Sequence, residues 1–158
     1  MIPGVIARFL DAASVAAAST RDRQLAPHLY MVSGWRAAPD QSEMRLLFGR
    51  SMLDQLKFDL QDNGRLAVTV ERIEAHETYQ FKGRVLDFVP LKPEDRDLHL
   101  ACRSRFVKAV RLEFDIAEEI LARHIPEPAA ALRLDVAEIF IQTPGPQAGV
   151  RLVPREGA

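Results

Sequence analysis

The sequence predicts a mainly β domain of six or seven antiparallel strands with flanking helices. Short segments of alternating apolar and polar residues fill most of the stretch from Pro27 to Val85, and one well-delimited helix interrupts them. The length of 158 residues is enough for one hydrophobic core but gives no reason to expect two. We therefore expect a single domain over residues 1–158.

The chain begins with an amphipathic helix and a first strand. Ile6, Phe9 and Leu10 recur at helical spacing, and a proline in the first turn favours a helix over residues 3–13. Residues 14–20 are mostly small and β-compatible, and a polar turn follows them. An antiparallel strand pair is the simplest interpretation of what comes next.

A second extended segment runs from residue 25 to residue 35. Its alternation places His28 and Tyr30 on one face and Leu29 and Met31 on the other. Either face is compatible with the interior of the domain. The segment is therefore predicted to be one continuous strand whose buried face the sequence leaves open.

A third strand and the most clearly marked helix follow. The strand alternates around Met44 and ends at Gly49, after which Ser51 is expected to cap a helix with Asp54 in a capping-box position. Gly64, directly after an asparagine, supplies the stop. The buried stripe of this helix is expected to contain the leucines at 53, 56 and 60.

The second half of the chain returns to the sheet after two helices. Strands are expected at 65–73 and 78–91, the latter long enough to bend around a barrel edge. A long helix then opens at residue 93, with Cys102 on its buried stripe, and a short helix ends near residue 124. The last expected strand is 132–142, before a segment rich in proline and glycine.

Composition narrows the function classes. A formal net charge of -1 gives no broad field for polyanions, so nucleic acid is not an expected partner. No apolar run approaches the roughly 20 residues of a membrane span, and Arg8 and Asp11 interrupt any secretory leader. We expect a cytoplasmic protein without a membrane partner. The basic residues Arg103, Arg105, Lys108 and Arg111 are expected to form a solvated helix face.

Common catalytic motifs are missing. Neither Ser33 nor Ser51 lies in a Gly-x-Ser-x-Gly elbow, and no dinucleotide or phosphate-loop fingerprint occurs. The four histidines are widely spaced and one cysteine cannot build a multi-cysteine site, so no metal site is predicted. No residue qualifies from the sequence as a catalytic acid or base.

A set of polar residues at strand ends and at a helix start remains as a candidate ligand site. Arg50 and the backbone N–H groups after Ser51 are suited to a phosphate. Gln80 and Lys82 share a strand face and can meet the polar edge of a planar ligand. The complete set is His28, Tyr30, Arg50, Ser51, Thr69, Gln80 and Lys82.

The order of elements from Ser14 to Leu91 resembles the pyridoxamine 5'-phosphate oxidase-like FMN-binding split-barrel superfamily. The resemblance rests on the strand pair, the third strand, the helix that ends at Asp62-Asn63-Gly64-Arg65, and the segment Gln80-Phe81-Lys82-Gly83-Arg84-Val85. It implies a split β-barrel, FMN as the cofactor, and a homodimer with two flavin sites at the subunit interface. In that setting the seven polar residues are the expected cofactor contacts.

The residues depart from the oxidase at defined positions. His28 and Ser33 stand near an arginine and a lysine of the oxidase, and Arg50-Ser51-Met52 supplies one cation where the oxidase has two. Glu77-Thr78-Tyr79-Gln80 replaces its Arg-Gln-x-Arg segment. The resemblance therefore does not extend to oxidation of pyridoxamine phosphate.

Three functions are compatible with this pattern. The leading hypothesis is an FMN-binding flavoprotein, a flavin-dependent oxidoreductase of unknown substrate. The alternative is a cofactor-free split-barrel dimer that acts as a small-ligand or partner-binding module, a hypothesis favoured by the missing phosphate cations. The third is haem binding through one of the four histidines.

Overall fold

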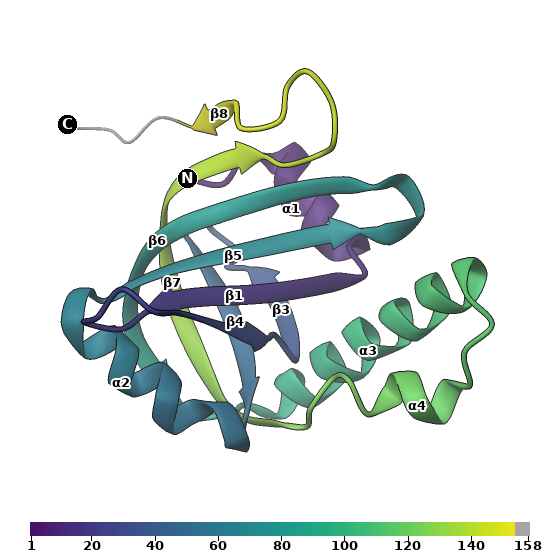
Figure 1. Cartoon of the computed structure of the whole chain (residues 1–158), viewed down its shortest axis with the longest axis horizontal. Helices are drawn as coiled ribbons and strands as arrows, with labels where there is room; N and C mark the ends of the chain where they lie inside the picture. Colours follow the sequence, from purple (N-terminus) through teal and green to yellow (C-terminus); the bar gives the residue numbers. More distant parts are fainter. Residues whose placement is uncertain (154–158) are drawn as a thin grey trace.

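The computed structural model describes residues 1–153 and consists of a strongly curled antiparallel sheet with helices around it (Figure 1). The strands are β1 (Val15–Arg21), β2 (Pro27–Met31), β3 (Gly34–Ala37), β4 (Glu43–Gly49), β5 (Arg65–Arg72), β6 (Glu77–Val89), β7 (Pro128–Ile141) and β8 (Arg151–Val153). The helices are α1 (Gly4–Ala12), α2 (Leu53–Asn63), α3 (Pro93–Glu113) and α4 (Glu118–Ala122), with 3₁₀ turns η1 (Arg50–Met52) and η2 (Ile73–Ala75). The expected fold class, a mainly β split barrel with flanking helices, is confirmed.

The strand order explains the curl. The sheet runs β2-β1-β5-β6-β7-β4-β3, with β8 added to β7 and all pairs antiparallel. Only Val32 and Ser33 separate β2 from β3, although these strands lie at opposite ends of that order. The Val32 N–H donates to Ala16 of β1, and the Ser33 N–H donates to Leu47 of β4. The sheet must therefore curl until its two edges meet at this dipeptide.

This geometry corrects the prediction of one strand over residues 25–35. The segment forms two strands that belong to opposite edges of the sheet. Only two residues separate the two strands, and β-forming residues occur in both, so the sequence pattern alone did not show the change of partner strand.

The core fills the inside of the curled sheet. In β5, Leu66, Val68 and Val70 are buried, whereas Thr69 faces outward. The face that the sequence left open in β2 is also settled, because Tyr30 is buried while Leu29 is 73% exposed. Outward residues of β5 therefore belong to a surface that the core does not use.

The helix after β4 ends as predicted but begins differently. Gly64 ends α2 as expected, in the left-handed conformation with φ of 62° and its N–H bonded to the Leu60 carbonyl. The predicted cap at Ser51 is wrong, since Ser51 lies inside η1 and makes no capping hydrogen bond. The chain passes from Gly49 directly into this 3₁₀ turn, so Ser51 already has a helical position.

The long helix α3 is attached to the barrel by buried polar contacts. Arg45 of β4 forms an ion pair of 2.5 Å with Asp95, whose carboxylate also accepts the Lys92 N–H at 2.7 Å. Cys102 is buried as predicted. Among residues 1–153 no helix has the length and apolar character that a bilayer crossing requires.

The strands near the C-terminus differ from the prediction in two ways. β7 begins at Pro128, four residues before the predicted start of its strand, and β8 was not predicted. A strand of three residues carries too little periodicity to be recognised in a sequence. The predicted polar end of the chain lies partly outside the described residues.

Candidate functional site

A groove of about 930 Å³ lies on the outer face of the sheet. Residues of β1, β5, β6 and β7 line it, and Ser19, Ala67 and Lys82 follow one another across three neighbouring strands. Their side chains point outward because the alternate residues of β1 and β5 fill the core. The groove is therefore a surface of the sheet that is free of core packing.

Thr69, Gln80 and Lys82 lie together on this outer face. Thr69 and Gln80 are direct cross-strand partners, and the Gln80 amide donates to the Thr69 hydroxyl at 3.2 Å. Lys82 lines the groove, and its ammonium lies 4.6 Å from the centre of the Phe140 ring on β7. The structure thus brings three of the seven candidate residues side by side.

His28 and Tyr30 belong to the opposite face. Tyr30 pairs with Ala18 across β2 and β1, and both side chains are buried. The neighbouring pair, Met31 and Ala17, lies on the outer face, where Ala17 pairs with Thr69 of β5. Both His28 and Tyr30 are engaged with one carboxylate of α2. The seven candidates therefore do not form a single group.

That carboxylate is Asp59, which the sequence analysis did not identify. It is 1% exposed, and its Oδ2 accepts hydrogen bonds from Tyr30 at 2.7 Å and from Thr20 at 2.5 Å. His28 Nδ1 lies 2.8 Å from the same oxygen, and Gln55 donates to Oδ1 at 2.8 Å. The sequence does contain a feature that could have identified Asp59: it is an acidic residue three positions after Leu56, on the buried stripe of the predicted helix.

The protonation states in this cluster follow from its hydrogen bonds. Burial by itself would raise the pKa of Asp59, but the four donated hydrogen bonds outweigh burial and lower its pKa to about 2. Burial and the contact with this carboxylate raise the pKa of Tyr30 above its usual value. Because the carboxylate is ionised at neutral pH, His28 must present its Nδ1–H to it, which leaves Nε2 for solvent or a ligand.

Arg50 and Ser51 lie apart from the outer-face group in the order of strands. They are exposed in η1 at the end of β4, and β7 separates β4 from β6. Among residues 1–153, Arg50 forms no ion pair with an acidic side chain. Its charge is thus available for an anion at the start of α2.

No family model matches the chain, and no curated protein matches it in sequence. Solved structures do match. HupZ of Group A Streptococcus aligns with a TM-score of 0.57 and 17% identity, covering 94% of this chain and 100% of that one. A candidate pyridoxamine 5'-phosphate oxidase of Lactobacillus delbrueckii aligns with a TM-score of 0.51 and 12% identity, over 85% and 90% of the two chains.

The fold is that of the pyridoxamine 5'-phosphate oxidase-like split barrels. A conserved hypothetical protein of Mycobacterium tuberculosis has the same architecture, with a TM-score of 0.50 and 18% identity over 88% of this chain and 82% of that one. At these identities the likeness concerns the fold. The residues of this split barrel must therefore carry any argument about its ligand.

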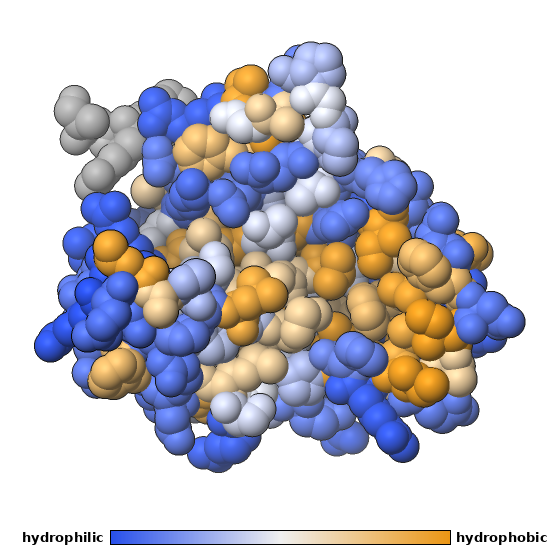
Figure 2. Space-filling model, viewed as in Figure 1, coloured by the Kyte–Doolittle hydropathy of each residue, from blue (hydrophilic) through white to orange (hydrophobic). Residues whose placement is uncertain are grey.

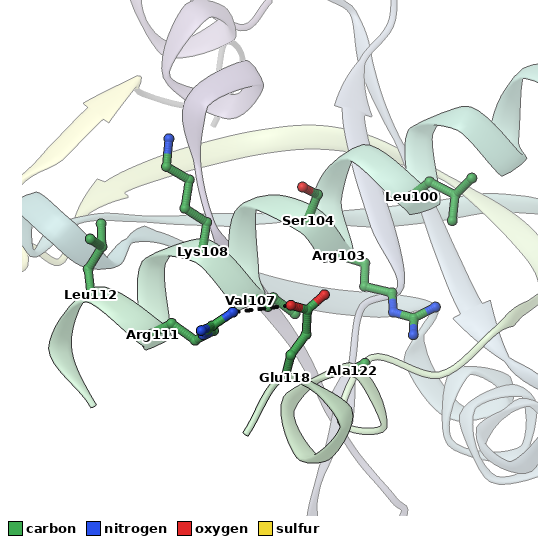
Figure 3. Close-up of a pocket in the computed structure, with 9 residues that line it drawn as sticks. All are labelled: Leu100, Arg103, Ser104, Val107, Lys108, Arg111, Leu112, Glu118 and Ala122. Atoms are coloured by element: carbon green, nitrogen blue, oxygen red, sulfur yellow. Dashed lines mark hydrogen bonds and ion pairs between the residues drawn. The ribbon is translucent and has the colours of Figure 1, made fainter. Parts of the chain in front are cut away.

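A second cavity, of about 600 Å³, lies beside the split barrel between α3 and α4. Figure 3 shows Arg111 and Glu118 meeting across it, at 3.2 Å, while Lys108 points away from this pair. Arg105 is bound to the Ala13 carbonyl and lies over the Trp35 ring instead. These cations do not converge on one point. The expectation of a solvated face does not hold for Arg105, which is partly buried against the domain, whereas Lys108 is exposed.

The histidines of the split barrel lie on four separate segments. His99 is buried in α3 with Nδ1 2.9 Å from the Ser33 carbonyl oxygen, and His124 follows α4. His76 is exposed after η2, and His28 is held by Asp59. Within the described part of the chain, no group of three or more histidine, cysteine or acidic residues is placed to hold a metal ion.

Proposed function

We propose that this protein binds FMN on the outer face of its split barrel and acts, as a homodimer, as a flavin-dependent oxidoreductase. One observation carries the proposal: a hydrogen-bonded Thr69–Gln80 pair and Lys82 stand side by side on the outer face, with Lys82 at the open groove of about 930 Å³. The shared fold with a candidate pyridoxamine 5'-phosphate oxidase supports it.

The residues on the outer face fit the polar edge of a flavin ring. The Gln80 amide nitrogen is bonded to Thr69, so its oxygen remains to accept a hydrogen bond from a ring N–H. The Lys82 ammonium can stabilise negative charge on the ring. The bound flavin would supply the redox chemistry, whereas these side chains would bind and orient it.

Arg50 does not belong to the groove lining of its own chain, so we assign it the FMN phosphate as a cation that the second copy of the proposed homodimer would contribute. Arg50 is exposed at the start of η1, and the first backbone N–H groups of a helical turn have no acceptor within that turn. His28 and Tyr30 are less suited to this role than their sequence positions suggest, because Asp59 already binds both.

The homodimer accounts for the apolar character of the outer face. Leu29 is 73% exposed on the outer face of β2. Three further apolar residues share this face: Met31 on β2, Ala17 on β1 and Ala67 on β5. Figure 2 shows apolar side chains gathered over the middle of this face, and a second apolar area over α3 and α4. A second copy on the sheet face would cover the first area and close the groove over its ligand.

Titration of the purified protein with FMN and with riboflavin, followed by flavin fluorescence, tests the cofactor. We expect saturable quenching at one flavin per chain. The Arg50→Ala variant should lose about 1.5–3 kcal/mol of binding free energy for FMN and nothing for riboflavin, which has no phosphate. Lys82→Gln should weaken both flavins, and the exposed Arg123→Gln should weaken neither.

A protein that ignores both flavins would refute the cofactor proposal. The alternative would then take its place, a cofactor-free split barrel that acts as a small-ligand or partner-binding module. The structure supports this alternative through Asp59, which binds both His28 and Tyr30. Of the residues predicted to contact the FMN phosphate, Arg50 is then the one remaining cation.

The dimer has its own test in Leu29→Asp. An exposed charge in the middle of an apolar interface should shift the protein from dimer to monomer at micromolar concentration, measured by light scattering after gel filtration. Leu112→Asp, on the exposed apolar surface of α3, is the matched control and should leave the mass unchanged. A wild-type protein that is already monomeric would contradict the proposal.

A further inference from the structure

The groove has a strongly basic end. Arg65 and Arg84 are direct cross-strand partners of β5 and β6, and both are exposed and line the groove. Lys82 lies two residues from Arg84 on the same face. In Figure 1 this end lies at the left, where the β1–β2 turn, the end of α2 and the start of β5 come together.

These cations lack acidic partners within residues 1–153. No carboxylate oxygen lies within 4.0 Å of the charged groups of Arg65, Arg84 or Lys82. Of the two acidic residues in the lining, Glu138 is bound to Arg151 at 2.8 Å. Asp135 is the cross-strand neighbour of Arg84 on β7 and makes no ion pair. The described lining therefore has an excess of positive charge.

Like charges directly opposite each other across two strands destabilise a sheet. The pair of Arg65 and Arg84 has this arrangement, and small residues lie close to it. Ala67 and Gly83 belong to the lining, and a Cβ added to Gly64 would lie 3.9 Å from Nη1 of Arg84. Cations beside small residues leave room for a ligand that brings the missing negative charge.

We propose that this end of the groove binds the phosphate or diphosphate group of a ligand, held by Arg65 and Arg84. Two guanidinium groups on adjacent strands, roughly 5 Å apart at the backbone, can each donate two parallel hydrogen bonds to phosphate oxygens. If the protein is a flavin-dependent oxidoreductase, this ligand would be a phosphorylated co-substrate, and that assignment rests on the proposed flavin function. Binding of the anion itself does not.

Inorganic pyrophosphate and phosphate are the probes, titrated calorimetrically into the flavin-free protein at low ionic strength. We expect saturable binding of pyrophosphate at one per chain, weakened by added salt. Arg65→Gln and Arg84→Gln should each weaken binding roughly 10-fold or more. Arg123→Gln, an equal change of charge at an exposed residue outside the groove lining, should weaken it less than twofold.

A second measurement needs no ligand. If the two arginines repel each other, Arg65→Gln should raise the urea midpoint of the ligand-free protein at low salt, and added salt should reduce the difference. A lowered midpoint with no pyrophosphate binding would overturn the proposal. So would binding that both groove variants and Arg123→Gln change equally.

Competition separates the sources of the phosphate. Pyrophosphate that still binds to the FMN-saturated protein identifies a second phosphorylated ligand. Displacement by FMN and not by riboflavin would instead place the flavin phosphate at Arg65 and Arg84 and remove it from Arg50. Both results support an anion site at Arg65 and Arg84. Failure of flavin binding alone would leave this site intact, so the two proposals fail separately.

Discussion

Replacing Asp59 with asparagine should lower the free energy of unfolding by about 2–3 kcal/mol, measured by urea denaturation at pH 7. The carboxylate accepts hydrogen bonds from four side chains in a buried site. An amide can accept with one oxygen only, and its NH₂ group must face a donor. Whichever of Thr20, Tyr30 and Gln55 faces that group must reorient or lose its partner, and the remaining hydrogen bonds lose their charged acceptor.

The pH dependence of this cluster has a definite sign. The pKa of Asp59 is lowered from 3.8 to about 2, so its contribution is fully present above about pH 4 and is lost as the pH falls toward 2. The stability difference between wild type and Asp59→Asn should therefore shrink over that range. Asp97→Asn, an exposed carboxylate of α3, should change stability by less than about 0.5 kcal/mol.

A smaller change separates the hydrogen bonds from the charge. Tyr30→Phe removes one donor and keeps the carboxylate, so it should cost about 1 kcal/mol. An Asp59→Asn variant that is as stable as wild type at pH 7 would show that the carboxylate contributes no net stability there.

Replacing Gly83 with alanine should destabilise the protein by about 3 kcal/mol or more. A Cβ at this position would overlap the carbonyl group of Asp135, with 2.8 Å to its carbon, and would lie 3.2 Å from the Cα of Val136. These atoms are backbone, so no side-chain rotation can relieve the contact. The β6–β7 pairing, which changes register between Lys82 and Gly83, would have to open.

Thermal and urea unfolding of Gly83→Ala measure this effect, with Gly4→Ala as the control. Gly4 starts α1, and a Cβ there meets no atom closer than 3.9 Å. Alanine should be neutral or stabilising at that position. Because Gly83 stands between Lys82 and Arg84, the destabilised variant should also bind pyrophosphate more weakly. An unchanged urea midpoint for Gly83→Ala would contradict the close approach of β6 and β7.

Much of the fold was predictable because it follows from local periodicity and termination signals. The stripe of α1 and the alternation of β5 identified the buried residues, and the glycine at 64 identified the end of α2. The prediction failed at Val32 and Ser33, where a connection of two residues joins strands at opposite ends of the sheet order. The choice of partner strand depends on residues distant in the sequence, such as Ala16 and Leu47.

The candidate site was predictable in part. Thr69, Gln80 and Lys82 were expected at a ligand surface, and they lie side by side on the outer face of the sheet. His28 and Tyr30 were expected in the same site, but they point to the opposite face. A shift of one residue in strand register exchanges the two faces, and the sequence contains no signal that fixes register across nonadjacent strands.

The sequence by itself determined the mainly β architecture, the position of α2 and the alternating faces of each strand, because these depend on neighbouring residues and on one period of hydrophobicity. Tertiary structure decided which faces join across strands. It brought Arg65 opposite Arg84 and aligned both with Lys82, and it placed Asp59 beneath His28 and Tyr30. Those arrangements depend on strand order and register, which long-range packing of the curled sheet selects.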